Sequence, residues 1–241
     1  MKVIVPDYYS RFRCIAGACR HTCCEGWEVD IDAESLLRYR TMADITPQIE
    51  ESDDTPHFRL GENERCPFLN SDKLCDLILR HGEDILCQIC RDHPRFRSFW
   101  SDRTEIGLGL VCEEAGRLIL SQEKPMELVV LSDDGTDAAL PEDEAWLLAY
   151  RDELLQNIEE TGPAARLLEY LIYRHLPDAL YDGRLDTRLA FIRQSFREIT
   201  DAWAQTDGTI TAMAECARVW SYDVEYDDEE QERRLATLEA E

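Results

Sequence analysis

The residues of this 241-residue chain best able to do chemistry are its ten cysteines, because a thiolate is both a nucleophile and a metal ligand. Two of them, Cys23 and Cys24, are adjacent, and Cys216 stands apart near the end of the chain. The other nine, which lie in the first half, are Cys14, Cys19, Cys23, Cys24, Cys66, Cys75, Cys87, Cys90 and Cys112. Thiols at such short, irregular spacing indicate a disulfide framework, a zinc site or an iron–sulfur site.

Chain length and the N-terminal residues argue against disulfides. A chain of this size can bury a core without covalent staples. Residues 1–9 reach an acid and two tyrosines before any apolar region forms, so we expect no signal peptide, and no window is apolar enough for a membrane span. We therefore expect a cytoplasmic protein, in which thiols stay reduced and a dense set of them indicates metal binding or catalysis.

The spacing of the cysteines leaves zinc and iron–sulfur open. Structural zinc often takes two C-x2-C pairs, and only Cys87-x2-Cys90 has that spacing. The adjacent pair Cys23-Cys24 suits zinc poorly, since neighbouring side chains on extended backbone point to opposite sides. Iron–sulfur clusters accept thiolates from separate segments. The C-x3-C-x2-C signature of radical enzymes is absent, and Cys216, in an apolar helical stripe, is expected to pack as a small apolar residue.

The charge of the chain excludes one class of partner. The net charge is −25; residues 1–120 carry 15 Lys and Arg against 22 Asp and Glu, and residues 121–241 carry 11 against 29, a net of −18. A field of this sign repels nucleic acid and favours a cationic partner.

Hydrophobic periodicity predicts a mostly α-helical fold with a small β component, in which a cysteine-rich metal-binding module packs on a C-terminal helical bundle. The expected domains are a cysteine-cluster module (1–121), a helical bundle continuous with it (122–222) and an acidic tail (223–241) that frays or forms an exposed helix. Helical patterns cover 33–42, 74–79, 83–89, 112–121 and four apolar stripes after residue 141. Strand-like runs cover 95–100 and 104–110, with a turn at 101–103, and residues 50–65 predict a loop or a weak hairpin. Residues 126–131 form a short apolar run that is followed by a loop.

Three cysteine segments resemble the flagellin lysine-N-methylase (FliB) family. They are Cys14 to Trp27 with its Cys-Cys pair, the run Cys66-Pro67-Phe68-Leu69 to Cys75, and Cys90-Arg91-x2-Pro94-Arg95. Cys112-Glu113-Glu114 also resembles the family's cysteine-plus-acid segment at a helix start. More distantly, the chain is similar to small cysteine-cluster proteins described as zinc- or iron-chelating. The resemblance covers about residues 5–120.

The resemblance implies a protein-lysine N-methyltransferase that uses S-adenosylmethionine and a [4Fe-4S] cluster, with zinc as the alternative metal. Its partner would be flagellin or another protein with exposed lysines. The metal-site cysteines it implies are Cys14, Cys19, Cys23, Cys24, Cys66, Cys75, Cys90 and Cys112, and Cys87 is the one that the family pattern favours least. The alternative is a non-catalytic zinc- or iron-binding interaction or metal-carrier protein.

A methylase must also deprotonate its target, since free lysine has a pKa of about 10.4. The sequence assigns neither the catalytic base nor the S-adenosylmethionine site. The side chains nearest the cysteine motif that could act as a base are Tyr8, Tyr9, Asp30 and Asp32, and helix capping or surface hydrogen bonding explains them equally well.

Overall fold

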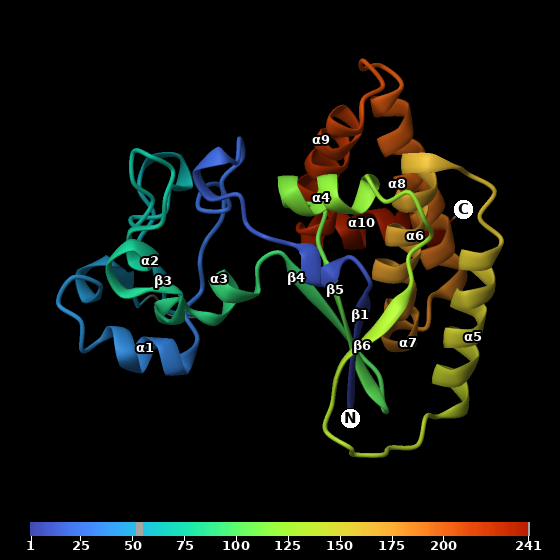
Figure 1. Ribbon diagram of the computed structural model, residues 1–241, viewed down its shortest axis with the longest axis horizontal. Helices are drawn as coiled ribbons and strands as arrows, with labels where there is room; N and C mark the ends of the chain where they lie inside the picture. Colours follow the sequence, from blue (N-terminus) through green and yellow to red (C-terminus); the bar gives the residue numbers. More distant parts are fainter. Residues whose placement is uncertain (52–54, 241) are drawn as a thin grey trace. The chain divides into compact units, whose positions relative to one another are not determined.

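The computed structural model describes residues 1–51 and 55–240 and divides the chain into two compact units (Figure 1). The helical unit comprises Met1–Arg13 and Pro94–Glu241, and the cysteine unit comprises Cys14–His93. The boundaries between the two units follow Arg13 and His93, whereas the sequence predicts a module boundary at residue 121. The segment before that position is split, because its first and last parts contribute strands to the sheet of the helical unit.

The sheet of the helical unit explains this division. Its four strands, in the order β4-β5-β1-β6, are β4 (Arg95–Phe99), β5 (Arg103–Leu108), β1 (Lys2–Pro6) and β6 (Leu128–Asp133). Strands β4 and β5 form the predicted antiparallel hairpin, while β1 runs parallel to β5 and antiparallel to β6. Because β1 precedes the cysteine unit in the chain and β4 follows it, the cysteine unit is an insertion between two strands of one sheet.

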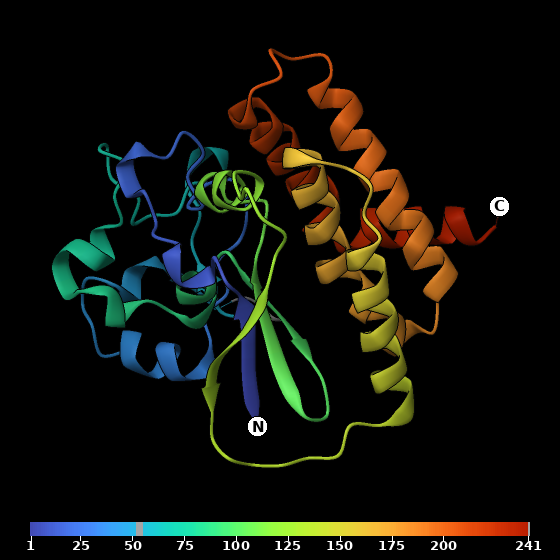
Figure 2. The ribbon, with the colours of Figure 1, turned by 45° about the vertical axis from the view of Figure 1, so that its right-hand side comes forward.

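Helices make up most of the remaining structure, so the predicted mostly helical fold with a small β component is confirmed, and the β component is a mixed sheet. Those of the helical unit are α4 (Glu113–Leu120), α5 (Glu142–Gln156), α6 (Gly162–His175), α7 (Ala179–Asp182), α8 (Leu185–Trp203), α9 (Ile210–Trp220) and α10 (Asp228–Glu239). Figure 2 shows α5, α6 and α8 side by side. Within the described parts of the chain, no helix has both the length and the apolar character needed to cross a bilayer.

The core of the helical unit lies between the sheet and these helices. The predicted apolar stripes supply buried residues such as Leu147, Leu171 and Ile192, whereas Trp146 is 56% exposed and stacks on Tyr150. On the sheet, the Phe96 ring lies over Gly107, where an added Cβ would come within 2.2 Å of the ring. Glycine is thus the residue that lets the aromatic layer pack closely on β5.

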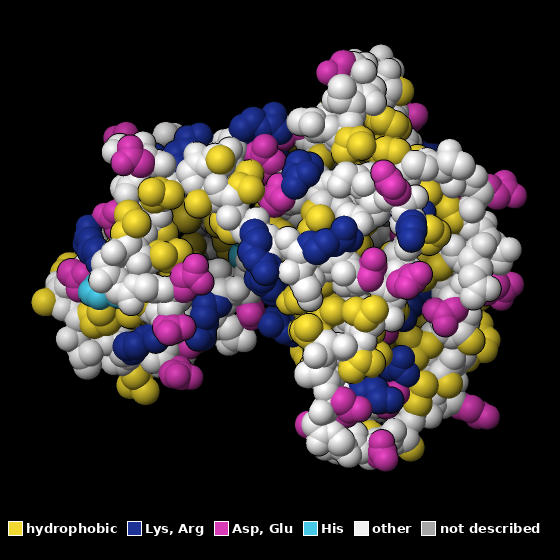
Figure 3. Space-filling model, in the orientation of Figure 1, with side chains coloured by type: hydrophobic (Ala, Val, Ile, Leu, Met, Phe, Trp, Pro, Cys, Tyr) yellow, Lys and Arg dark blue, Asp and Glu magenta, His cyan; other side chains and the backbone are white. Residues whose placement is uncertain are grey.

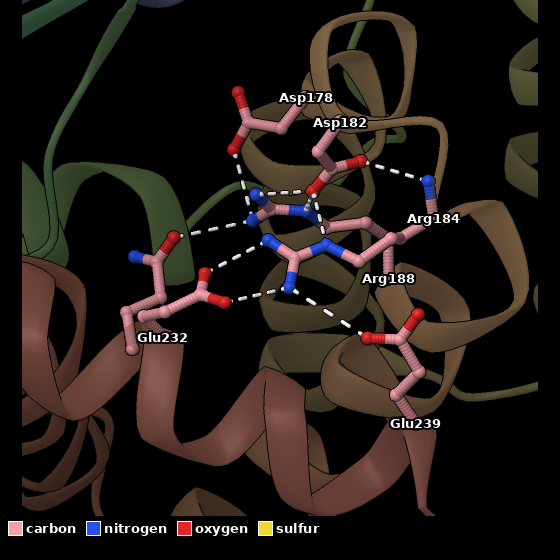
Figure 4. Close-up of polar contacts among 7 residues, drawn as sticks. Asp178, Asp182, Arg184, Arg188, Glu232 and Glu239 are labelled. Carbon is pink, nitrogen blue, oxygen red and sulfur yellow. Dashed lines mark hydrogen bonds and ion pairs between the residues drawn. The ribbon is translucent and has the colours of Figure 1, made fainter.

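The acidic C-terminal segment forms a helix, α10, which is one of the two expected alternatives, and this helix is anchored rather than frayed. A π-helical turn, Ser221–Glu225, follows α9, and Leu235 of α10 is buried in the core. Arg184 donates to both carboxylate oxygens of Glu232 at 2.8 Å (Figure 4). Arg188 donates to Gln231 at 3.1 Å. The arginines at the start of α8 therefore use part of the segment's negative charge to hold α10 in place.

The cysteine unit is built from much shorter elements. Its helices are α1 (Ala33–Tyr39), α2 (Asp76–His81) and α3 (Gln88–Asp92), and its strands are β2 (Ile49–Glu50) and β3 (His57–Phe58). Strands β2 and β3 pair antiparallel, as the weak hairpin predicts, although residues 52–54 of that prediction lie outside the described residues. The small core contains a row of aromatic rings, in which Phe58 lies 5.7 Å from Tyr39 and 5.0 Å from Phe68.

Candidate metal centre

A tight loop places Cys66 and Cys75 near each other. The amide of Leu69 donates to the Cys66 carbonyl at 3.1 Å, and Leu69 forms an isolated bridge with Cys75. Within the loop, Asn70 Oδ1 accepts hydrogen bonds from the amides of Asp72 at 2.9 Å and Leu74 at 3.0 Å. The Cys-Pro-Phe-Leu run thus folds as a turn that returns the chain to Cys75, the residue that precedes α2.

Cys24 joins this pair through the backbone, since the Cys66 amide donates to the Cys24 carbonyl at 2.8 Å. A hydrogen bond with the Cys23 thiol lowers the pKa of Cys24 to about 7, even though burial opposes that change. Burial, together with the neighbouring charges of Cys24, Cys75 and Cys87, raises the pKa of Cys66 to about 12. These thiols therefore lie close enough for the charge of one to affect the ionisation of another.

Cys87 and Cys90 form the C-x2-C pair at the start of α3. Cys87 is completely buried, and it hydrogen-bonds the Cys90 thiol across the first helical turn. That bond lowers the pKa of Cys87 and raises the pKa of Cys90, which burial and the charges of Cys24 and Cys66 raise further. The pair, including the cysteine that the family pattern favours least, thus belongs to the same group of thiols.

We name as the thiol group the buried and half-buried cysteines that influence one another's ionisation: Cys24, Cys66, Cys75, Cys87 and Cys90. The exposed Cys23 adjoins this group through its hydrogen bond with Cys24. Of the remaining predicted ligands, Cys14 and Cys23 are exposed, and Cys19 donates to the His21 carbonyl at 2.8 Å. Cys112 precedes α4 in the helical unit. The structure therefore brings together part of the predicted set and adds Cys87 to it.

The donor chemistry of the thiol group fits a metal that prefers sulfur, such as zinc or the iron of an iron–sulfur cluster. Several half-buried thiols, whose negative charges oppose one another, can ionise together only if a cation compensates them. Among residues 1–51 and 55–240, no three Cys, His, Asp or Glu side chains are already arranged as a closed metal site. The thiol group therefore fits a metal by the type and proximity of its ligands, and its side chains would have to move to bind the metal.

Asp32 links two helices of the cysteine unit. Its carboxylate accepts from the Ser35 amide at 2.9 Å, as the predicted cap of α1, and from the Gln88 amide at 2.8 Å at the start of α3. Burial raises its pKa, but these hydrogen bonds outweigh that effect and lower the pKa to about 2. A carboxylate so stabilised is a poor base, so Asp32 serves to position Cys87 and Gln88.

The other candidate bases have varied surroundings. Tyr8 is buried in the helical unit, and burial, followed by the Glu169 charge, raises the pKa of its phenol. The Tyr9 hydroxyl accepts a hydrogen bond from Arg95 Nε at 2.9 Å. Asp30 is exposed and forms a backbone bridge with His57. The structure thus gives Tyr8 a core position and leaves Asp30 at the surface of the cysteine unit.

A buried charged cluster in the helical unit was missed from the sequence. The Tyr170 hydroxyl donates to Glu225 at 2.7 Å, and His175 Nε2 and Arg174 Nε lie 3.2 and 3.4 Å from its carboxylate. Burial opposes ionisation of Glu225, but His175, Arg174 and Ser221 outweigh it and lower its pKa to about 2. These polar residues lie among the apolar stripes of α6 and in the segment predicted to be a tail, and no spacing signalled their convergence.

The sequence comparisons place the chain among distant homologues of lysine-modifying proteins. It is 23% identical over 188 residues to lysine-N-methylase of Salmonella typhimurium and 22% identical to that of Salmonella choleraesuis, covering 71% of this chain and 47% of each relative. It is 25% identical over 137 residues to the flagellar biosynthetic protein FliU of Salmonella muenchen, covering 52% of this chain and 81% of that protein. The resemblance to lysine-N-methylases is thereby confirmed as distant homology.

The same comparisons set the extent of that relationship. The chain spans about half the length of the lysine-N-methylases that it matches. No family model matches the chain, and no solved structure matches it.

Proposed function

We propose that this chain is a protein-lysine N-methyltransferase of the flagellin-modifying type that uses S-adenosylmethionine and an iron–sulfur cluster. The observation that carries the proposal is the homology to two lysine-N-methylases over 188 residues. The thiol group supports it as a place for the cluster, with Cys24, Cys66, Cys75, Cys87 and Cys90 as the residues that would supply ligands. A cluster bound there would supply compensating positive charge and structural support for the cysteine unit.

In the proposed reaction, the neutral lysine amine of the client attacks the sulfonium methyl. A carbon–nitrogen bond forms, the carbon–sulfur bond breaks, S-adenosylhomocysteine leaves, and the amine gives up a proton to a base or to solvent. The acidic surface of residues 121–241 would concentrate cationic client segments near the enzyme. In this proposal the chain attracts the client by charge, and S-adenosylmethionine donates the methyl group.

A second candidate function is a metal-stabilised binding module that acts without S-adenosylmethionine. Two cavities in the helical unit are small. One, of about 10 Å³, is lined by Tyr8, Arg166 and Glu169, and the other, of about 150 Å³, is lined by Glu198, Arg233 and Arg234. Both are smaller than the roughly 300–1,000 Å³ usual for a ligand of cosubstrate size. The chain also spans only about half of the matched methylases.

The two functions are distinguished by anaerobic purification followed by two measurements. Iron, sulfide and zinc analysis with a visible spectrum identifies the metal, and mass spectrometry of flagellin incubated with the protein and S-adenosylmethionine detects methylation. The methyltransferase proposal expects iron and sulfide, and added methyl masses on flagellin lysines. A colourless zinc protein contradicts the iron–sulfur assignment, and fully loaded protein that adds no methyl groups contradicts the enzymatic one.

A further inference from the structure

Strand β6 is an open edge of the sheet in the helical unit. It pairs with β1 on one side and, among the described residues, with no strand on the other. Val129, Val130 and Leu131 are 42%, 57% and 48% exposed, and because they are consecutive, both faces of the strand are open. Figure 3 shows hydrophobic side chains at the surface in the region of β6. Such an edge is a template for another strand.

The opposite edge of the same sheet is built differently. Strand β4 alternates between buried and more exposed residues, and its outward positions include Arg95 and Arg97. Charged side chains on an edge strand oppose pairing with a further strand. From Leu128 to Ser132, β6 carries no charge at all. Of the two edges, β6 is therefore the one suited to accept a strand.

The register of β6 shows which backbone groups point outward. The Asp7 amide donates to the Glu127 carbonyl at 2.8 Å, so this pair is hydrogen-bonded. In an antiparallel ladder, hydrogen-bonded and non-hydrogen-bonded pairs alternate. The register against β1 is regular from Leu128 to Val130, so the backbone groups of Val129 face Val5, while those of Leu128 and Val130 face the open edge. Beyond Val130 the register shifts by one residue, as in a β-bulge. An incoming strand would find a donor and an acceptor at each of these two residues.

The negative charge around β6 favours an incoming strand that is positively charged. Glu127 precedes the strand, and Asp133 and Asp134 lie at its other end. The N-terminal ammonium pairs with Asp134 and Lys2 lies opposite Asp133, but residues 121–241 as a whole carry a net charge of −18. A second copy of this chain would bring like charge to the edge. A cationic segment is attracted instead.

We propose that β6 is the docking edge for the client protein, whose extended, lysine-bearing segment pairs with Leu128–Asp133 as a fifth strand. Basic residues of the segment lie near Glu127 at one end and Asp133 at the other, about 20 Å apart at the usual rise of a strand, and apolar or β-branched residues lie between them. The identity of the partner as a lysine-bearing client rests on the proposed function, whereas the edge pairing rests on β6 itself.

The test uses a fluorescent synthetic peptide of alternating threonine and valine with a lysine at each end, titrated with the full chain and followed by anisotropy. One control peptide has alternate backbone amides methylated, and the other has glutamate at each end. Val130→Pro removes an outward-facing amide without touching the bonds to β1, and Val130→Lys adds charge to the edge. Val219→Lys is the matched control, because Val219 is an exposed valine on α9 of the same unit.

The lysine-flanked peptide should bind wild type, and both control peptides should bind at least about tenfold more weakly, a difference of ~1.4 kcal/mol. Val130→Pro and Val130→Lys should weaken binding by a similar factor, while Val219→Lys should leave it within about twofold. The proposal is overturned by absent binding to wild type, by equal binding of the amide-methylated peptide, or by unchanged affinity in both Val130 variants. A wild-type dimer that Val130→Pro converts to a monomer also overturns it, since a second copy would then occupy β6.

The same variants separate this proposal from the proposed function. If the peptide binds at β6 but flagellin gains no methyl groups, the methyltransferase proposal fails and the docking edge stands. If flagellin is methylated by Val130→Pro with an unchanged KM, the docking edge fails and the methyltransferase proposal stands.

Discussion

The two units of this chain are stabilised by different means. In the helical unit, α5, α6 and α8 have 15, 14 and 19 residues and bury continuous apolar stripes. In the cysteine unit, α1, α2 and α3 have seven, six and five residues around a small aromatic core that includes Cys66 and Cys87. A core of that size usually contributes only a few kcal/mol. One unit can therefore fold on apolar burial alone, while we propose that the other depends on a bound metal.

The largest expected effect comes from removing a buried thiol of the thiol group. Cys66→Ser and Cys87→Ser should each lose most of the metal and unfold the cysteine unit, because a structural metal contributes up to about 10–16 kcal/mol. Metal analysis and mapped limited proteolysis check this, with new cleavage confined to residues 14–93. Cys216→Ser, on α9 of the helical unit, is the control. Intact metal content and an uncut cysteine unit in both variants would refute metal dependence.

The next effect concerns the helical unit alone. Arg151 and Glu105 form a completely buried bidentate ion pair, with Nη1 and Nη2 at 2.5 and 2.9 Å from the carboxylate. Glu105→Ala leaves the Arg151 charge buried without this partner, so we expect a loss of about 3–5 kcal/mol in urea unfolding at unchanged metal content. Glu144→Ala, which removes an exposed carboxylate bonded to Ser101, should cost far less. Equal stability of the two variants would contradict the importance of the pair.

The buried Glu225 predicts a pH dependence for the helical unit. Its pKa is lowered to about 2 from its ordinary value of 4.5, so its stabilisation is present above pH 4.5 and is lost as the pH falls towards 2. Burial lowers the pKa of His175, so below pH 6.5 the unfolded chain binds a proton more readily than the folded one at this residue. The stability of the helical unit therefore also falls as the pH drops below 6.5.

Glu225→Gln should therefore lose about 3 kcal/mol at pH 7 and show a flatter acid dependence than wild type. Urea unfolding at neutral pH and at two acidic values measures both, and parallel curves for the two proteins would show that Glu225 has no such role.

The smallest effect tests the cap that joins two helices of the cysteine unit. Asp32→Ala removes acceptors for the Ser35 and Gln88 amides and should cost about 1–2 kcal/mol in the stability of the metal-bound cysteine unit. Asp30→Ala, at an exposed position two residues earlier, is the control and should cost no more than about 0.5 kcal/mol. A chelator titration followed by Trp27 fluorescence compares the variants. Identical chelator midpoints for the two variants would show that Asp32 does not stabilise the cysteine unit.

Local patterns gave the helices, the β4–β5 hairpin and the Asp32 cap, because each depends on residues close together in the chain. The position of β1 between β5 and β6 depends on pairing across about a hundred residues, which no local pattern encodes. Anchoring of α10 likewise requires Arg184 and Glu232 to meet, although both are ordinary surface residues in sequence.

Cysteine spacing identified the region of the candidate metal centre but not the membership of the thiol group. Cys87 lies against Cys90 because one helical turn of α3 brings their thiols together. Cys112 lies in the helical unit because it follows β5 of the sheet. Which of these thiols bind metal stays a prediction, since ligand choice depends on side-chain positions that spacing does not fix.

The central claim, that only the cysteine unit depends on a metal, is tested most directly by hydrogen exchange with mass spectrometry on wild-type protein before and after anaerobic chelation. The account predicts that amides in residues 14–93 lose protection on metal removal, while those of α6, α8 and α9 keep theirs. Unchanged protection throughout, or an equal loss in both units, would contradict it.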